Sequence, residues 1–111
     1  MHRSPATHCM AITTTDSAET AERLARGIVQ ARVGACAQVV GPIKSVYWWD
    51  DAVQAEPEWQ IWIKTTTAKL DALTAHITAN HSYDVPEVVA TPIIGGNPAY
   101  LEWVTNETQE R

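Results

Sequence analysis

Short runs of β-branched residues alternate along the chain with segments whose apolar positions recur at helical spacing. Residues 10–15 form one such run, and it is typical of a strand. In the following segment the apolar side chains recur every three or four residues, which indicates one buried helix face. Asp16 or Ser17 is a suitable N-cap for this helix, and Gly34 is the expected left-handed residue after its end. The apolar positions of the predicted helix are Ala21, Leu24, Ala25 and Ile28.

The rest of the chain repeats this alternation of extended and helical patterns. The expected elements are extended segments at 35–49 and 57–66, a helix at 68–80, a strand at 87–94 and a helix opened by Asn97-Pro98. Asp50-Asp51 and the polar residues up to Glu56 are expected to form the turn between the two long segments. The element order predicts an α+β fold of the ferredoxin-like split β-α-β type, with both main helices on one face of an antiparallel sheet.

The length and charge of the chain limit the number of domains and the classes of binding partner. A chain of 111 residues is expected to form a single domain, here over residues 10–111, after a flexible N-terminal tail at 1–9. The formal net charge of -5 argues against non-specific binding to nucleic acid or anionic membranes, and no apolar run reaches the length of a membrane helix. With only Cys9 and Cys36, a reducing, cytoplasmic location is predicted. We expect Cys36 to be buried and Cys9 to be exposed before the first strand.

The long hairpin carries an unusual aromatic cluster. Fifteen extended residues at 35–49 would span about 50 Å, whereas a domain of this size is about 35 Å across. The hairpin must therefore bend, for which Gly41-Pro42 is suited, or project from the domain. An exposed strand edge rich in aromatic residues is an aggregation hazard, so we expect other copies of the chain to cover it in a closed ring. The alternative is that these side chains fill the core of a monomer. The aromatic residues are Tyr47, Trp48, Trp49, Trp59 and Trp62.

Several short motifs, in order and at fixed spacing, identify a family. The chain resembles the CutA divalent-cation-tolerance family over about residues 10–108. The matching runs are Ala35-Cys36-Ala37, Ser45-Val46-Tyr47-Trp48-Trp49, Glu58 with Lys64-Thr65, His81-Ser82-Tyr83-Asp84-Val85-Pro86-Glu87, Gly96 and Tyr100-Leu101-Glu102-Trp103. Where the family usually has His-Pro-Tyr, this chain has His81-Ser82-Tyr83.

The resemblance implies a homotrimer, an architectural likeness to PII signalling proteins, and a role in tolerance to divalent metals, copper especially. It attaches no catalytic reaction to the family. Copper ligands proposed in some members correspond to Thr13, His76 and Asn80 here, and of these only His76 could bind copper. A copper site of that kind is therefore not expected in this chain.

The candidate ligand site is a cleft between subunits. Glu58 and Lys64 lie on one face of a strand but too far apart to pair, so each needs a partner from elsewhere. One hypothesis is a cleft facing a small polar or anionic ligand; the other is a structural network that fixes the trimer. The candidates for this cleft are Tyr47, Trp49, Glu58, Lys64, His81, Tyr83 and Glu87.

His76 and His81 are the candidate ligands for Cu²⁺ or another divalent cation. The alternative for each is a surface or turn histidine with local hydrogen bonds, because a lone histidine gives no ligand set. No phosphate-binding loop or local catalytic motif is present, so an enzyme is not predicted. The sequence therefore favours a trimeric module that binds or signals through a small ligand or a metal. The alternative is a structural trimer that anchors a partner protein and has a vestigial cleft.

Overall fold

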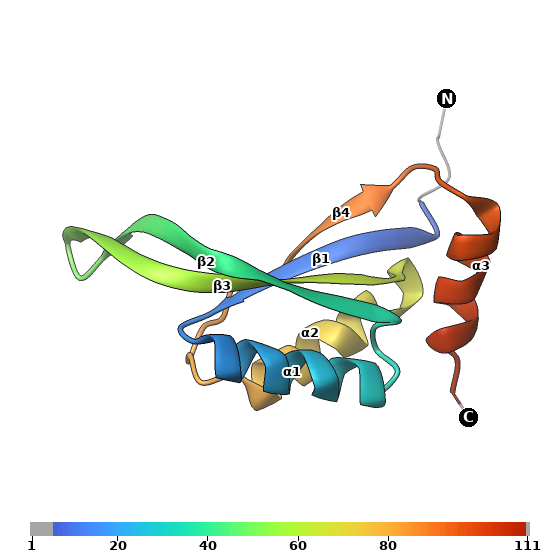
Figure 1. Cartoon of the computed structure of the whole chain (residues 1–111), viewed down its shortest axis with the longest axis horizontal. Coiled ribbons are helices and arrows are strands. Elements are labelled where there is room, and N and C mark those ends of the chain that lie inside the picture. Colours follow the sequence, from blue (N-terminus) through green and yellow to red (C-terminus); the bar gives the residue numbers. More distant parts are fainter. Residues whose placement is uncertain (1–5, 111) are drawn as a thin grey trace.

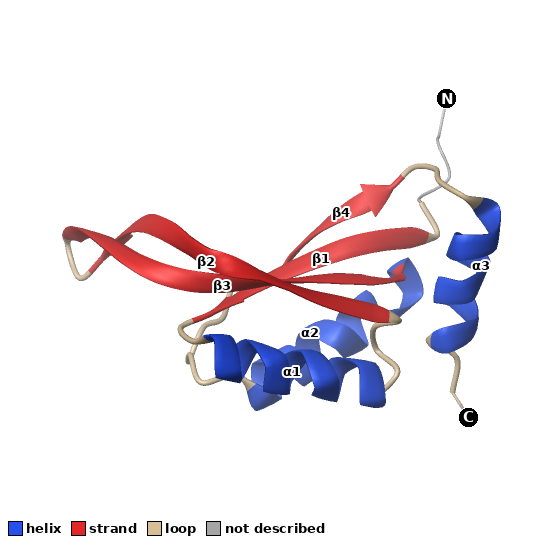
Figure 2. Cartoon of the chain, viewed as in Figure 1, coloured by secondary structure: helices blue, strands red, loops and turns tan. Residues whose placement is uncertain are grey.

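The computed structural model describes residues 6–110 as one four-stranded antiparallel sheet with strand order β2-β3-β1-β4. Two helices, α1 and α2, cover one face of the sheet, and α3 stands at the end opposite the hairpin tip (Figures 1 and 2). This confirms the predicted α+β, ferredoxin-like split β-α-β fold. The elements are β1 (His8–Thr15), α1 (Ala18–Gln30), β2 (Cys36–Trp49), β3 (Ala52–Thr66), a 3-10 turn η1 (Thr67–Lys69), α2 (Leu70–Asn80), β4 (Val89–Ile93) and α3 (Pro98–Glu107).

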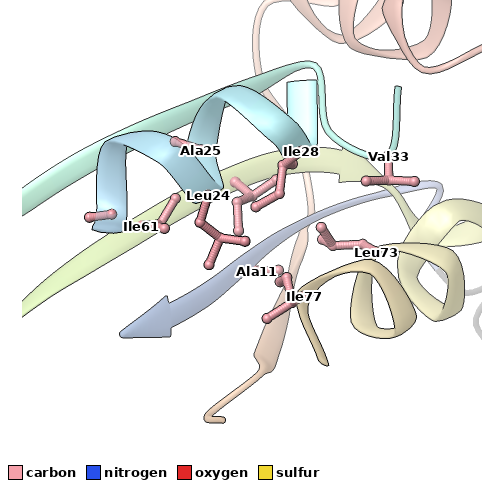
Figure 3. Close-up of a cluster of buried hydrophobic side chains, with 10 residues drawn as sticks. Ala11, Leu24, Ala25, Ile28, Val33, Ile61, Leu73 and Ile77 are labelled. Carbon is pink, nitrogen blue, oxygen red and sulfur yellow. The ribbon is translucent and has the colours of Figure 1, made fainter. Parts of the chain in front are cut away.

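The hydrophobic core lies between the two helices and the sheet. Leu24 and Ile28 of α1 and Ile77 of α2 pack against Ile61 and other apolar residues of the central strands (Figure 3). All four positions predicted for the buried face of α1 are buried, because the spacing of i, i+3, i+4 and i+7 places them on one side of the helix. The opposite face of the sheet has no helix from residues 6–110 lying along it, apart from α3 at one end (Figure 1).

The junction after α1 differs from the prediction. Ser17 caps the helix, with its hydroxyl accepting from the Thr20 backbone N–H, but the left-handed residue is Arg32, at a φ of 60°. Gly34 does not have a positive φ. Its backbone packs so closely that an added Cβ would lie 2.6 Å from Ile63 Cγ2 and 2.7 Å from Ile28 Cγ2. This glycine is required by close packing, and its expected role as a left-handed cap was wrong.

The hairpin of β2 and β3 projects far beyond the two helices (Figure 1), in a chain that measures 43 × 37 × 23 Å. Its strand register shifts between Val40 and Ile43, where the Gly41-Pro42 bend was predicted. The predicted turn over 50–56 was too long. Asp50 and Asp51 alone form it, with φ angles of 53° and 61°, so β3 begins at Ala52. Two consecutive left-handed residues suit a tight hairpin turn, and Asp tolerates this conformation.

The start of the chain also needs a correction. β1 begins at His8, so residues 8 and 9 belong to the sheet and not to a tail; residues 1–5 of the predicted tail lie outside the described residues. Cys9 is buried, contrary to prediction, because it shares the helix-covered face of β1 with Ala11. Cys36 is only half-buried, although we expected it to be buried. Both cysteines are free thiols.

Candidate functional site

A groove of about 470 Å³ lies between the hairpin, the end of β1 and the segment that leads into β4. The strand register explains how the hairpin contributes to it. Tyr47, Trp49 and Glu58 all fall on the sheet face that α1 and α2 leave uncovered, and Thr14 of β1 points to the same face. We call this feature the acidic groove. Its lining residues are Thr14, Tyr47, Trp49, Glu58, Ser82, Tyr83, Asp84, Val85 and Glu87.

A hydrogen bond joins the two sides of the acidic groove. The Tyr83 hydroxyl donates to Glu58 Oε2 at 2.9 Å, which ties the segment before β4 to strand β3. Burial raises the pKa of Tyr83, and the hydrogen bond and negative charge of Glu58 raise it further, with smaller contributions from Asp16 and Tyr47. Tyr83 is therefore a neutral phenol at physiological pH, and its proton holds the Glu58 carboxylate in place.

His81 fixes the turn beneath Tyr83. Its Nε2 lies 2.7 Å from the Thr14 carbonyl oxygen, which can only accept, so Nε2 carries the proton. Its Nδ1 accepts from the Tyr83 backbone N–H at 3.0 Å, and the two rings are 4.7 Å apart between centroids. Both imidazole nitrogens are thus engaged by the backbone. This is the arrangement of a locally hydrogen-bonded turn histidine, and it leaves no lone pair for a metal.

Two other predicted site residues lie outside the acidic groove. Lys64 is six residues along β3 from Glu58, beside Cys36 and Met10 in the strand register, and it donates to the Gln38 side chain. His76 lies on α2, and its Nε2 is 3.4 Å from where a Cβ on Gly27 of α1 would be. Within residues 6–110 no three His, Cys, Asp or Glu side chains come together to hold a metal ion.

Four lining residues, Thr14, Ser82, Asp84 and Val85, are not among the predicted site residues. Ser82, Asp84 and Val85 belong to the motif that supplied His81, Tyr83 and Glu87, so the motif as a whole was the signal. Thr14 could have been found only from the pairing of β1 with β3, because it faces the groove through its position opposite Gln60.

The charge of the acidic groove is negative. Its lining contains the carboxylates of Glu58, Asp84 and Glu87, and the lining residues among 6–110 include no Lys or Arg. An anion in this groove would meet like charge on several sides. The expected cleft for a small polar or anionic ligand lies between subunits, and it stays a prediction.

The helices of this fold are short. No helix within residues 6–110 is long and apolar enough to cross a membrane.

Comparisons with known proteins agree with the fold and the motifs. The family model described as CutA1 divalent ion tolerance protein matches residues 9–107. "Protein CutA 1, chloroplastic" of Oryza sativa subsp. japonica is 50% identical over 97 residues, which cover 87% of this chain and 55% of that protein. The chain spans about half the length of this relative and of the similar Arabidopsis thaliana protein. "Divalent-cation tolerance protein CutA" of Thermus thermophilus is 38% identical over 95 residues, which cover 86% of this chain and 92% of that protein.

Solved structures give the same result. The crystal structure of CutA1 from Oryza sativa superposes with a TM-score of 0.91 at 46% identity, covering 96% of this chain and 98% of that chain. The divalent cation tolerance protein from Thermus thermophilus superposes with a TM-score of 0.89 at 35% identity, covering 92% and 99% of the two chains. By sequence and by structure, this chain belongs to the CutA divalent ion tolerance family.

Proposed function

We propose that this chain is a subunit of a homotrimer that takes part in divalent-cation tolerance by binding a small ligand in the acidic groove. The tolerance role is proposed from the family, whose relative in Thermus thermophilus is named a divalent-cation tolerance protein. The observation that carries the ligand-binding part is the acidic groove itself, a concave site with aromatic walls and a small number of fixed polar groups.

The assembly is supported by the apolar surface that one chain leaves in water. On the helix-side face of the hairpin, Trp48 is 74% exposed, and Val46 and Val53 are more than half exposed. The outer strands β2 and β4 also have unpaired edges within the described part of the chain. A second copy covers such a surface at low cost, since a symmetric ring uses the same two patches in every subunit. The proposed number of subunits, three, follows from the resemblance to the CutA family, which implies a homotrimer.

A binding role suits the acidic groove better than a catalytic one. Histidine is the side chain best suited to proton transfer near neutral pH, and His81 has both nitrogens committed to the backbone. Tyr83 and Glu58 are joined to each other, so the phenol proton is already donated. These residues give the groove a fixed shape. We therefore propose recognition without chemical conversion, as in the PII-like interpretation.

The described residues do not fit a resident copper ion. His76 and His81 come from different surroundings, and His81 offers no free nitrogen. Copper favours imidazole or sulfur ligands in a set of several, and the free thiols Cys9 and Cys36 lie on opposite faces of the sheet. We propose that the role in copper or other metal tolerance is indirect, through the ligand of the acidic groove.

Sedimentation velocity and calorimetry test this function. In sedimentation, we expect one species with three times the chain mass of 12.2 kDa at micromolar concentration. In calorimetry, we expect that Cu²⁺ does not bind stoichiometrically through His81, so His81→Ala leaves the titration unchanged. A stable monomer would contradict the proposed assembly. A trimer that binds no small molecule in the groove would instead favour the alternative of a structural trimer that anchors a partner protein.

A further inference from the structure

The acidic groove combines aromatic walls with uncompensated negative charge. We propose that it binds a small organic cation, an aliphatic amine with one or more ammonium groups, through Trp49 and Tyr47 and the carboxylates of Glu87 and Asp84. This inference rests on the proposed function, since it names the ligand class of the same groove.

The aromatic side chains are presented in the way that a cation requires. Tyr47 and Trp49 are two residues apart on β2, so both rings project from the same face of the hairpin into the groove. The faces of indole and phenol rings carry negative electrostatic potential and attract ammonium groups, and Trp is the strongest of these partners. Both side chains keep part of their surface exposed and are therefore accessible to a ligand in the single chain.

The negative charge of the groove is not neutralised by the chain. The ion pairs found within residues 6–110 are Arg26 with Glu22 and Arg32 with Glu107, and neither involves a groove carboxylate. Glu58 accepts a hydrogen bond from a neutral phenol, which leaves its charge in place. The groove thus presents three carboxylates to a ligand, and charge complementarity favours a cation.

The arrangement suits an organic cation better than a bare metal ion. Ca²⁺ and Mg²⁺ need about six oxygen ligands converging at roughly 2.0–2.6 Å, and no three acidic or metal-binding side chains converge within the described residues. The carboxylates are instead spread around a groove of about 470 Å³, which is in the size range of small-molecule sites. A ligand with a hydrocarbon body can place methylene groups against Val85 and the rings while its ammonium groups reach the carboxylates.

The test uses 1,4-diaminobutane as the probe, with 1,4-butanediol and succinate as neutral and anionic controls of similar length. Isothermal titration of the full chain at neutral pH is expected to give saturable binding of the diamine alone, weakened by added salt. Equal binding of the diol would overturn the inference, because it would show an apolar groove with no preference for charge. Binding of succinate in preference to the diamine would overturn it as well.

Matched variants locate the binding. Trp49→Ala and Glu87→Gln are each expected to weaken diamine binding by about threefold to tenfold, as loss of a cation–π contact or an ion pair at a partly exposed site predicts. Trp103→Ala is the control for the first, because Trp103 is an exposed tryptophan on α3 that does not line the groove. Asp71→Asn on α2 is the control for the second.

Glu87→Gln changes charge without volume, so it keeps the test decisive even if Trp49→Ala disturbs folding. Equal affinities in the groove variants and their controls would overturn the inference. Sedimentation of the same samples separates the two proposals. A trimer that fails to bind the diamine contradicts the ligand class alone, whereas a monomer contradicts the proposed assembly.

Discussion

Tyr83 donates its hydroxyl proton to Glu58 at 2.9 Å, joining two residues that are 25 positions apart in the sequence. Glu58 belongs to the projecting hairpin, and Tyr83 belongs to the segment that leads into β4. Both residues line the acidic groove, so this contact ties its two sides together. Burial, and then this bond, raise the pKa of Tyr83, so its hydroxyl stays protonated beside Glu58.

Removing the hydroxyl tests this relationship. Tyr83→Phe is expected to lower the free energy of unfolding by about 1 kcal/mol, since a hydrogen bond to a charged, partly exposed acceptor is lost. Urea denaturation at fixed protein concentration measures the change. Tyr47→Phe is the matched control, because no hydrogen bond of the Tyr47 hydroxyl is found in the described residues. Equal losses in the two variants would contradict a specific role for Tyr83.

The pH dependence of stability gives an independent test of the same pair. Tyrosine in an unfolded chain ionises near its ordinary pKa of 10.0, whereas burial and Glu58 raise the pKa of Tyr83 in the folded chain. Above about pH 10 the unfolded state therefore loses this proton first and gains stability relative to the folded state. The contribution of Tyr83 is complete below that pH and is lost as the pH rises toward the folded-state pKa.

The measurement compares the wild-type chain with Tyr83→Phe at about pH 8 and about pH 11. We expect the wild-type free energy of unfolding to fall more steeply than that of the variant between these two points. Parallel curves would show that Tyr83 ionises alike in both states, contrary to the raised pKa.

His81 is expected to act on the groove through structure and not through metal binding. His81→Ala removes the donor to the Thr14 carbonyl and the acceptor for the Tyr83 backbone N–H. Each of these two backbone groups then loses a hydrogen-bond partner. A loss of about 1–3 kcal/mol in the free energy of unfolding follows from that penalty. His76→Ala is the comparison, since His76 lies near Gly27 of α1 and does not line the groove. A variant that keeps wild-type stability but loses Cu²⁺ would support a metal ligand instead.

The secondary structure could be predicted well wherever one side of an element is buried. The face of α1 follows from the spacing of Leu24 and Ile28, because helical periodicity decides which side chains meet the core. The strand over residues 52–56 could not be predicted, because these residues are mostly exposed and no apolar alternation distinguishes strand from loop there. The two-residue turn at Asp50-Asp51 has no glycine to mark it.

The acidic groove could be predicted only in part. Tyr47, Trp49, Glu58, Tyr83 and Glu87 were grouped through the family resemblance, and the structure brings all five to one groove. Spacing along β3 cannot distinguish Glu58 from Lys64 as a groove residue, because both lie on the same face of the strand. The position of the segment before β4, which lies beside Glu58, decides which of the two lines the groove. Asp84 could not be placed for a similar reason, since it enters the groove through a loop.

The exposed hairpin makes the assembly testable with one substitution. Val46→Asp places a charge on the helix-side face of the hairpin, away from the acidic groove, at a side chain that is 64% exposed in the single chain. If other copies cover this surface, burying the new charge costs several kcal/mol per subunit and shifts the trimer toward monomer. Sedimentation velocity measures the shift.

Ala72→Asp is the control for Val46→Asp, because it adds the same charge at an exposed position on α2. The control is expected to sediment as the wild type does. A Val46→Asp chain that also stays trimeric would mean that the hairpin surface at Val46 is solvent-exposed in the assembly.

Gly34 and Gly95 form a matched pair that tests the packing at the end of α1. A methyl group at Gly34 would lie 2.6–2.7 Å from the Cγ2 atoms of Ile63 and Ile28, both fully buried, so the core must shift to admit it. We expect Gly34→Ala to lower the free energy of unfolding by about 1–3 kcal/mol, the usual cost of overpacking. At Gly95 nothing lies within 4 Å of the added methyl group, and Gly95→Ala is expected to be neutral or slightly stabilising, because alanine reduces the freedom of the unfolded chain. Chemical denaturation of the two variants checks both signs, and a tolerated Gly34→Ala would show that the α1 junction can move away from β3 without loss.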